Sequence, residues 1–260
     1  MARENGRFSL KKSVWSSLLY GAAALLALLL LWIVAYFAAA NEYLVPSPKD
    51  TFREMVALLK EKAFYTAFSE TFLRCLTAFI ISFICAVCAA VAAYLSKPIE
   101  KIAAVFVSAL RSLPTMAIIL LILVWSSPKK APVIVAFLAL FPMLYTGVLS
   151  AFCSIDVRYK KVCDVYAVPL YKRVFSMYFP LVLPQVIREG AGGLSFSIKL
   201  VVSAEIMANT FKSLGGMLQE AKIYLELPRL FALTLIVVLT GLITETLGNA
   251  LAALSERRVR

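Results

Sequence analysis

Four charged side chains interrupt long apolar stretches of this 260-residue chain: Arg111, Lys199, Glu205 and Glu245. A charge at the centre of a bilayer costs about 2.5–3.5 kcal/mol on insertion scales, so such residues need a path, a partner or water beside them. Lys199 and Glu205 are six residues apart, nearly two helical turns, which disfavours a salt bridge between them within one helix. Each of the four could also be a structural pair or a side chain that reaches the membrane interface.

Most enzymatic chemistry is excluded by the residues that are missing. The chain has no histidine, which rules out a Ser-His or Cys-His nucleophile and any histidine metal site. A Ser-Lys site stays open, because Ser203 lies four residues after Lys199. There is no phosphate-binding GxxxxGK[ST] loop, so any ATP and Mg²⁺ would be bound by another subunit. We predict no catalytic residues, no metal site and no cofactor in this chain, and we interpret its five cysteines as small packing residues.

The elements that carry these charges are apolar runs of membrane-spanning length. Apolar residues make up 62% of the chain, and runs of about 20 such residues cross a bilayer as helices. We therefore predict an all-α, polytopic membrane protein with six transmembrane helices. The runs are 15–39, 75–95, 102–124, 132–152, 190–207 and 230–251. The second begins earlier, near Ala67, and carries Glu70 and Arg74 in its first turns, whereas Arg111 and Pro114 interrupt the third.

The distribution of Lys and Arg predicts that both termini are cytoplasmic. With the N-terminus inside, fifteen of these residues fall in inner segments and eight in outer ones. The net charge of +12 then reflects membrane orientation and lipid contact, not nucleic acid. We expect a cytoplasmic segment at 1–14, a membrane domain at 15–252 and a basic cytoplasmic tail at 253–260. The first apolar run is too long for a signal peptide and is expected to stay as an anchor.

The inner segment from Asp156 to Glu189 is far longer than a turn between two helices requires. Its helical pattern breaks at Pro169, and an amphipathic piece follows that ends at Pro180 and Pro184. A short helix across the cytoplasmic mouth could insert into a groove on a partner protein. Its contact side chains would be Val162, Val165, Tyr166 and Val168. The alternative is an interfacial helix that rests on lipid headgroups.

Several motifs in order resemble the permeases of ABC importers, of the binding-protein-dependent nitrate, sulfonate, taurine and bicarbonate type. They are LVPSP at 44–48, TFLRCLTAF at 71–79, LRSLPTMAIILLILVW at 110–125, LFPMLYTGVLS at 140–150, FPLVLPQVIREGAGG at 179–193 and KLVVSAEIM at 199–207. The segment 156–189 is then similar to the family's cytoplasmic coupling loop. There the family's Glu-Ala-Ala falls on Lys161, Val162 and Cys163, and its glycine falls on Ala167.

This resemblance implies a type I importer fold in the bacterial plasma (inner) membrane. It also implies a homodimer, two ATPase subunits on the cytoplasmic side and an extracytoplasmic substrate-binding protein. Coupling to the ATPase would fall on Val162, Cys163, Asp164, Val165, Tyr166, Ala167, Val168 and Pro169. The translocation path would be lined by Arg111, Pro114, Lys199 and Glu205.

Other classes of function stay open at this point. An ion-coupled secondary transporter would need no ATPase, although the two halves of the chain show no evident similarity to each other. The segment with Gly215 and Gly216 would be either a re-entrant helix that closes the outer gate or meets the binding protein, or an ordinary turn and surface helix. The cargo is not indicated by the sequence.

Overall fold

The computed structural model describes residues 20, 23, 26–39 and 44–259, with the backbone alone for 255–259. Over these residues every regular element is a helix. The helices are Leu26–Ala39, α2 (Pro48–Leu58), α3 (Lys62–Leu95), α4 (Lys97–Ser112), α5 (Thr115–Trp125), α6 (Ala131–Cys153), α7 (Val157–Val165), α8 (Leu170–Lys172), η1 (Arg173–Tyr178), α9 (Phe179–Met207), α10 (Leu214–Ile223) and α11 (Leu227–Val259).

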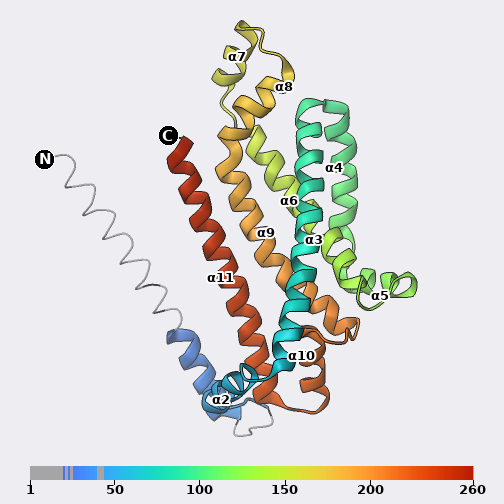
Figure 1. The fold of residues 1–260 in the computed structure, drawn as a ribbon, viewed down its shortest axis with the longest axis vertical. Helices are drawn as coiled ribbons and strands as arrows, with labels where there is room; N and C mark the ends of the chain where they lie inside the picture. Colours follow the sequence, from blue (N-terminus) through green and yellow to red (C-terminus); the bar gives the residue numbers. More distant parts are fainter. Residues whose placement is uncertain (1–19, 21–22, 24–25, 40–43, 260) are drawn as a thin grey trace, which may run out of the picture.

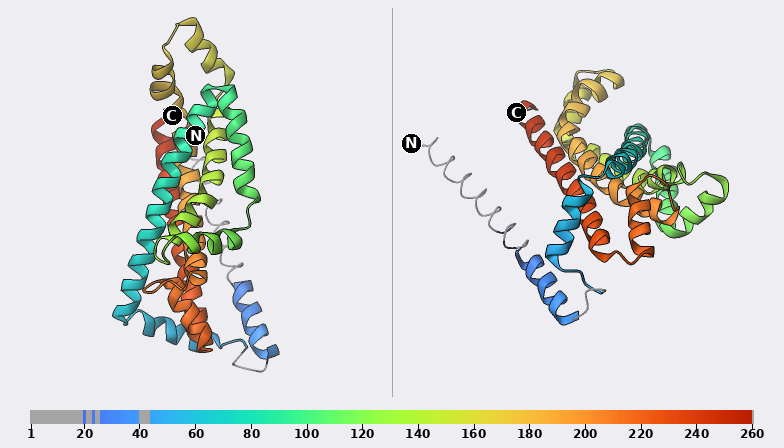
Figure 2. Two further views of the ribbon diagram at one scale, coloured as in Figure 1. Left: turned by 90° about the vertical axis from the view of Figure 1, so that its right-hand side faces the viewer. Right: turned by 60° about the horizontal axis from the view of Figure 1, so that its bottom comes forward.

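Four long helices, α3, α6, α9 and α11, form the bundle, and α6 lies in its upper half (Figure 1). One end of the bundle carries α7 and α8, and we call it the α7 end. The other end carries α2 and α10, and we call it the α10 end (Figure 1). α4 runs back beside the upper half of α3, and α5 then leaves the bundle sideways at mid-height (Figures 1 and 2). The tightest packing joins α3 to α6, α9 to α11 and α6 to α9.

Small side chains allow the central helices to approach closely. Ala78, Ser82, Ala86 and Ala90 recur every four residues along α3, and all four are fully buried. This spacing places them on one helix face, and small residues on such a face are what helix packing in lipid requires. Ala78, at the start of this row, therefore fits its position.

Among the described residues, four helices are long and apolar enough to span a membrane, and α4 with α5 forms a fifth span if the bent pair is taken as one. The axis turns by 93° at the break between Ser112 and Thr115, where Pro114 cannot continue the helix. Of the first predicted span, 15–39, only Leu26–Ala39 is described as a continuous helix, and nine of its residues, like the segment 1–14, lie outside the described residues. The other five predicted spans correspond to the four long helices and the bent pair, and the total of six stays a prediction.

Two predicted boundaries were wrong. α3 begins at Lys62, so Glu70 and Arg74 lie more than two turns inside the helix and not in its first turns. No helix ends at Pro180 or Pro184, because η1 and α9 belong to one continuous helix, Leu170–Met207, that passes through both prolines. α11 continues as helix to Val259, and the basic cytoplasmic tail at 253–260 stays a prediction.

Candidate functional site

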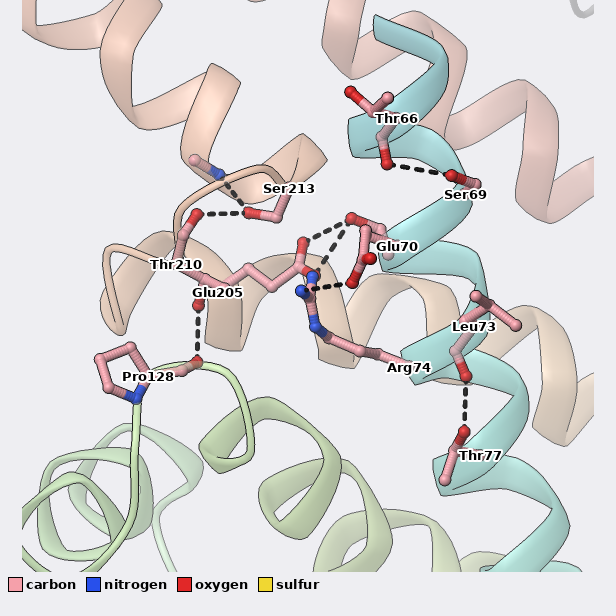
Figure 3. A network of polar contacts seen from close by, with 12 residues as sticks. Thr66, Ser69, Glu70, Leu73, Arg74, Thr77, Pro128, Glu205, Thr210 and Ser213 are labelled. Carbon is pink, nitrogen blue, oxygen red and sulfur yellow. Dashed lines mark hydrogen bonds and ion pairs between the residues drawn. The ribbon is translucent and has the colours of Figure 1, made fainter. Parts of the chain in front are cut away.

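A buried ion pair lies between α3 and α9 near the α10 end (Figure 3). Glu205 of α9 is fully buried, and its Oε1 accepts a hydrogen bond of 2.7 Å from Nη1 of Arg74 on α3. Nη2 of Arg74 reaches Oε2 of Glu70 at 3.1 Å, one turn earlier on α3. Because Glu70 is about half exposed, Arg74 connects the interior of the bundle to its surface.

The same carboxylate also fixes the start of α10. The Gly215 N–H donates to Oε2 of Glu205 at 3.1 Å, and Oγ1 of Thr71 donates to the same oxygen at 2.9 Å. Thr71 in turn accepts from the Leu214 N–H at 2.9 Å. The first N–H groups of a helix lack partners within the helix and carry partial positive charge, so a carboxylate beside them is favourable.

Gly215 permits this close approach. A Cβ at this position would lie 2.4 Å from the Cβ of Glu205 and 2.8 Å from the backbone N of Ile206 and the backbone O of Val202. No side chain fits there, which explains a glycine inside the first turn of α10. Ser213 caps the helix by accepting from the Gly216 N–H at 2.8 Å (Figure 3).

A second polar region lies at the break between α4 and α5. Nη2 of Arg111 contacts Oγ1 of Thr146 on α6 at 2.6 Å and the Pro142 carbonyl at 3.4 Å, and both partners are neutral. A cavity of about 180 Å³ adjoins Arg111 and is also lined by Phe196 and Leu200 of α9. These two residues flank the position of Lys199 on the helix.

The structure separates the four predicted path residues into two groups. Arg111, Pro114 and Lys199 are exposed, on elements that meet at this cavity. Glu205 is on the opposite side of α9, turned toward α3 and α10, and so does not join them. Sequence reasoning missed Arg74 and Thr71 as its partners, although a lone arginine within an apolar helix was the available signal. Glu245, the fourth deep charge, is exposed and meets Ser195 at 3.4 Å.

Comparison with known proteins identifies the family. The model of the binding-protein-dependent transport system inner membrane component matches residues 78–260, which is more than half of the chain. The chain belongs to this family. It is therefore a membrane permease component of a transporter of the ABC importer class. None of the curated proteins compared matches the chain.

Two solved structures support the fold. An inward-facing structure of the MetNI methionine ABC transporter aligns with a TM-score of 0.65 at 14% identity, covering 74% of this chain and 96% of the other. An amino acid ABC transporter crystallised with histidines aligns with a TM-score of 0.58 at 15% identity, covering 75% and 94%. At these identities the likeness establishes the type I permease-like fold of the bundle.

In this permease the segment predicted to couple to an ATPase forms a projecting helix and turn at the α7 end (Figure 1). Val165 and Tyr166 are 81% and 75% exposed, and Val162 and Asp164 also face outward. Cys163 is buried and Val168 is partly buried against the core of the bundle. The predicted residues therefore form two groups. We call the exposed Val162, Asp164, Val165 and Tyr166 the tip, and Cys163 and Val168, which contact the core, the anchor.

Arg173 and a capping turn hold this segment. The guanidinium of Arg173 pairs with Asp164, and its Nε donates to the Val168 carbonyl at 2.6 Å, while Pro169 precedes α8. At the start of α7, Asp156 accepts from the Arg158 N–H, and the side-chain and backbone contacts with Arg158 lower the pKa of this carboxyl. The cap is thus present at neutral pH and is lost as pH falls through that lowered pKa.

α7 ends in a Schellman turn whose left-handed residue is alanine. Ala167 has φ 47°, its N–H bonds to the Asp164 carbonyl at 3.1 Å, and the Val168 N–H bonds to the Cys163 carbonyl at 3.0 Å. The resembled family's glycine falls on this position, and the backbone explains why, because a Cβ disfavours φ above zero. Asn209 (φ 48°) after α9 and Leu225 (φ 58°) after α10 occupy the same position in equivalent turns.

We expect Glu205→Gln to lower the free energy of unfolding by about 3 kcal/mol, because it leaves the Arg74 cation buried with only Glu70 to pair it. Thermal or denaturant unfolding in detergent, followed by circular dichroism, measures the loss. Adding Arg74→Met to Glu205→Gln should recover part of it. Glu245→Gln is the matched control, since Glu245 is exposed, and should change stability by less than about 0.5 kcal/mol. Equal losses for the two Glu→Gln variants would contradict a special role for the buried pair.

Ala167→Gly should stabilise the end of α7 by about 1 kcal/mol, because glycine relieves the left-handed strain. Amide hydrogen exchange at Val168, whose N–H closes the turn, should slow by about fivefold. Asn209→Gly is the control in an equivalent turn and should slow exchange at Thr210 by less, because asparagine tolerates this conformation better than alanine. Faster exchange in Ala167→Gly would show that the turn is not strained.

Proposed function

We propose that this permease forms, with a second copy of itself, the translocation path of an ABC importer in the bacterial inner membrane. Two separate ATPase subunits bind ATP and Mg²⁺ and act on the α7 end. An extracytoplasmic binding protein delivers a small solute to the α10 end. The observation that carries the proposal is the exposed tip of α7, built on a fixed anchor, in a chain of this transport family.

The tip is suited to docking because it exposes apolar surface. Val165 and Tyr166 are adjacent and almost fully exposed, and large exposed apolar residues of this kind mark interfaces. The anchor formed by Cys163 and Val168 fixes their position relative to the bundle. A force on the tip is therefore transmitted to the spans and not absorbed by a loose loop.

The path lies on the face where α4, α5, α6 and α9 meet. Lys199 is exposed there and has no ion-pair partner among the described residues, and Arg111 contacts only neutral oxygens. Ser203 is exposed one turn after Lys199 on α9. A face with two uncompensated cations is costly against lipid, whereas a water-filled path between two copies accommodates them.

Transport follows from mechanical linkage between the two ends. Closure of the ATPase subunits on ATP draws the two α7 tips together, and the anchored spans turn with them from inward-facing to outward-facing. Hydrolysis resets the arrangement. Nucleotide state and gate state must then share a coupling free energy, typically about 1–3 kcal/mol.

The double variant Val165→Asp plus Tyr166→Asp should abolish copurification of the ATPase in mild detergent, because two carboxylates would be buried in an apolar contact. Mass spectrometry and ATPase assay of the eluate measure this. The matched control is Tyr224→Asp plus Leu225→Asp, a similarly exposed pair at the α10 end that should retain the ATPase. If no ATPase copurifies with the intact wild-type dimer, the importer proposal fails. An ion-coupled secondary transporter is then the hypothesis to test.

Cysteines placed on the proposed path should react with a charged, water-soluble thiol reagent. In a background without the five native cysteines, Lys199→Cys and Ser203→Cys should react at least about tenfold faster than Ile243→Cys, because a lipid-covered thiol is not reached by ions. Ile243 is exposed on the apolar surface of α11 and serves as the control. Equal protection of all three positions would place the path elsewhere.

A further inference from the structure

A cavity of about 360 Å³ lies at the α7 end, away from the proposed path. Its walls come from the last residues of α3, the first turn of α4, the end of α6, α7, α8 and η1. They are Tyr94, Leu95, Lys97, Glu100, Leu149, Cys153, Lys160, Leu170, Arg173 and Tyr178. The cavity therefore occupies the joint between the proposed coupling helix and the membrane helices.

The ends of the spans place this cavity at the membrane surface. α3 ends at Leu95, α6 ends at Cys153 and the candidate span that contains α9 begins at Leu170. α4, the first half of the broken span, begins at Lys97. Since four candidate spans start or end at the cavity walls, the cavity lies at the depth of the lipid headgroups and not in the hydrocarbon core or in bulk water.

The walls carry more positive than negative charge. Lys97, Lys160 and Arg173 come from three different elements, and Glu100 is the acidic residue among the lining side chains. Glu100 pairs with Lys97 at 2.9 Å, and Arg173 pairs with Asp164 outside the cavity. The Lys160 ammonium lies over the Tyr94 ring at 5.0 Å and has no acidic partner among the described residues. The Lys160 ammonium is thus available to pair with an anionic ligand in the cavity.

Apolar side chains surround the charged walls. Leu95 and Leu170 line the cavity and are 42% and 59% exposed, and Tyr171 and Phe175 are exposed beside them. A free phosphate in water would gain nothing from these side chains. A phospholipid would place its acyl chains against them and its headgroup among the lysines, and basic pockets between helices on the cytoplasmic side bind such headgroups.

We propose that this cavity binds the phosphate headgroup of an anionic phospholipid. The bound lipid contacts α7 through Lys160 and the spans through Lys97 and Tyr94, so it braces the joint that transmits force from the coupling helix. Its effect on transport rests on the proposed function. The binding itself does not, because it requires only the cavity, the charges and the membrane surface.

The test compares two double variants in nanodiscs of phosphatidylcholine that contain a minor fraction of phosphatidylglycerol. Lys97→Gln plus Lys160→Gln removes two cavity lysines, and Lys101→Gln plus Lys161→Gln removes two exposed lysines of the same helices that do not line the cavity. Native mass spectrometry of the released protein measures retained phosphatidylglycerol. The cavity variant should retain about tenfold less than wild type, and the control should change by less than about twofold.

Cys153 provides a second measurement on the unaltered protein. Its thiol is exposed and lines the cavity, so labelling of the peptide that contains it should be slower in phosphatidylglycerol nanodiscs than in pure phosphatidylcholine. Cys85 and Cys88, exposed along the apolar part of α3, are covered by lipid in both nanodiscs and should stay unlabelled by a charged thiol reagent in both.

The proposal is overturned by absence of phosphatidylglycerol enrichment in wild type, by equal loss in both double variants, or by unchanged labelling of Cys153. Protection of Cys153 by soluble glycerol phosphate, at concentrations that match the lipid, would assign the site to a free anion and overturn the lipid. An ATPase that fails to copurify, with lipid retention intact, would instead count against the proposed function alone.

Discussion

The arrangement of the α10 end depends on one carboxylate. Glu205 is buried in a part of the molecule where no water is available to solvate it, so its charge must be met entirely by protein groups. Arg74, Thr71 and the N–H of Gly215 meet it from two other elements. Because breaking a buried pair leaves an uncompensated charge, the pair specifies how α3, α9 and α10 fit together more than it adds to stability.

α9 links this buried pair to the other end of the molecule. It runs for 29 residues, about 44 Å, from η1 beside the coupling segment to Glu205 beside α10. A helix of this length, packed against α3, α6 and α11, moves as a unit. The segment at its base, Arg173–Tyr178, is a π-helix, a form with weaker geometry that is frequent at functional sites. In the proposed mechanism, α9 is the element that passes a displacement of α7 to the α10 end.

Elements that depend on local sequence could be predicted from the sequence alone. Apolar runs located the long helices, and Pro114 located the break in the third predicted span. Features that depend on contacts between distant parts of the chain could not be predicted. Inside α3, Arg74 pairs with Glu205, a residue 131 positions later in the chain. No periodicity reveals such a partner. Likewise, Val168 reads as part of an amphipathic docking face, but the Schellman turn at Ala167 directs it back onto the bundle.

The positions of backbone strain fit the proposed mechanics. Left-handed conformations are adopted by Ala167 after α7, Asn209 after α9 and Leu225 after α10. Each costs free energy that glycine would largely avoid, and each is held by contacts on either side of the turn. At Ala167 these contacts are the burial of Cys163 and Val168, and after α9 they include the Thr210 hydroxyl bonded to the Pro128 carbonyl at 2.9 Å (Figure 3). A turn whose left-handed residue is stabilised only by such contacts is expected to change conformation when the contacts are lost. α7, the helix that moves in the proposed mechanism, is thus joined to the bundle at a point where the backbone stores strain.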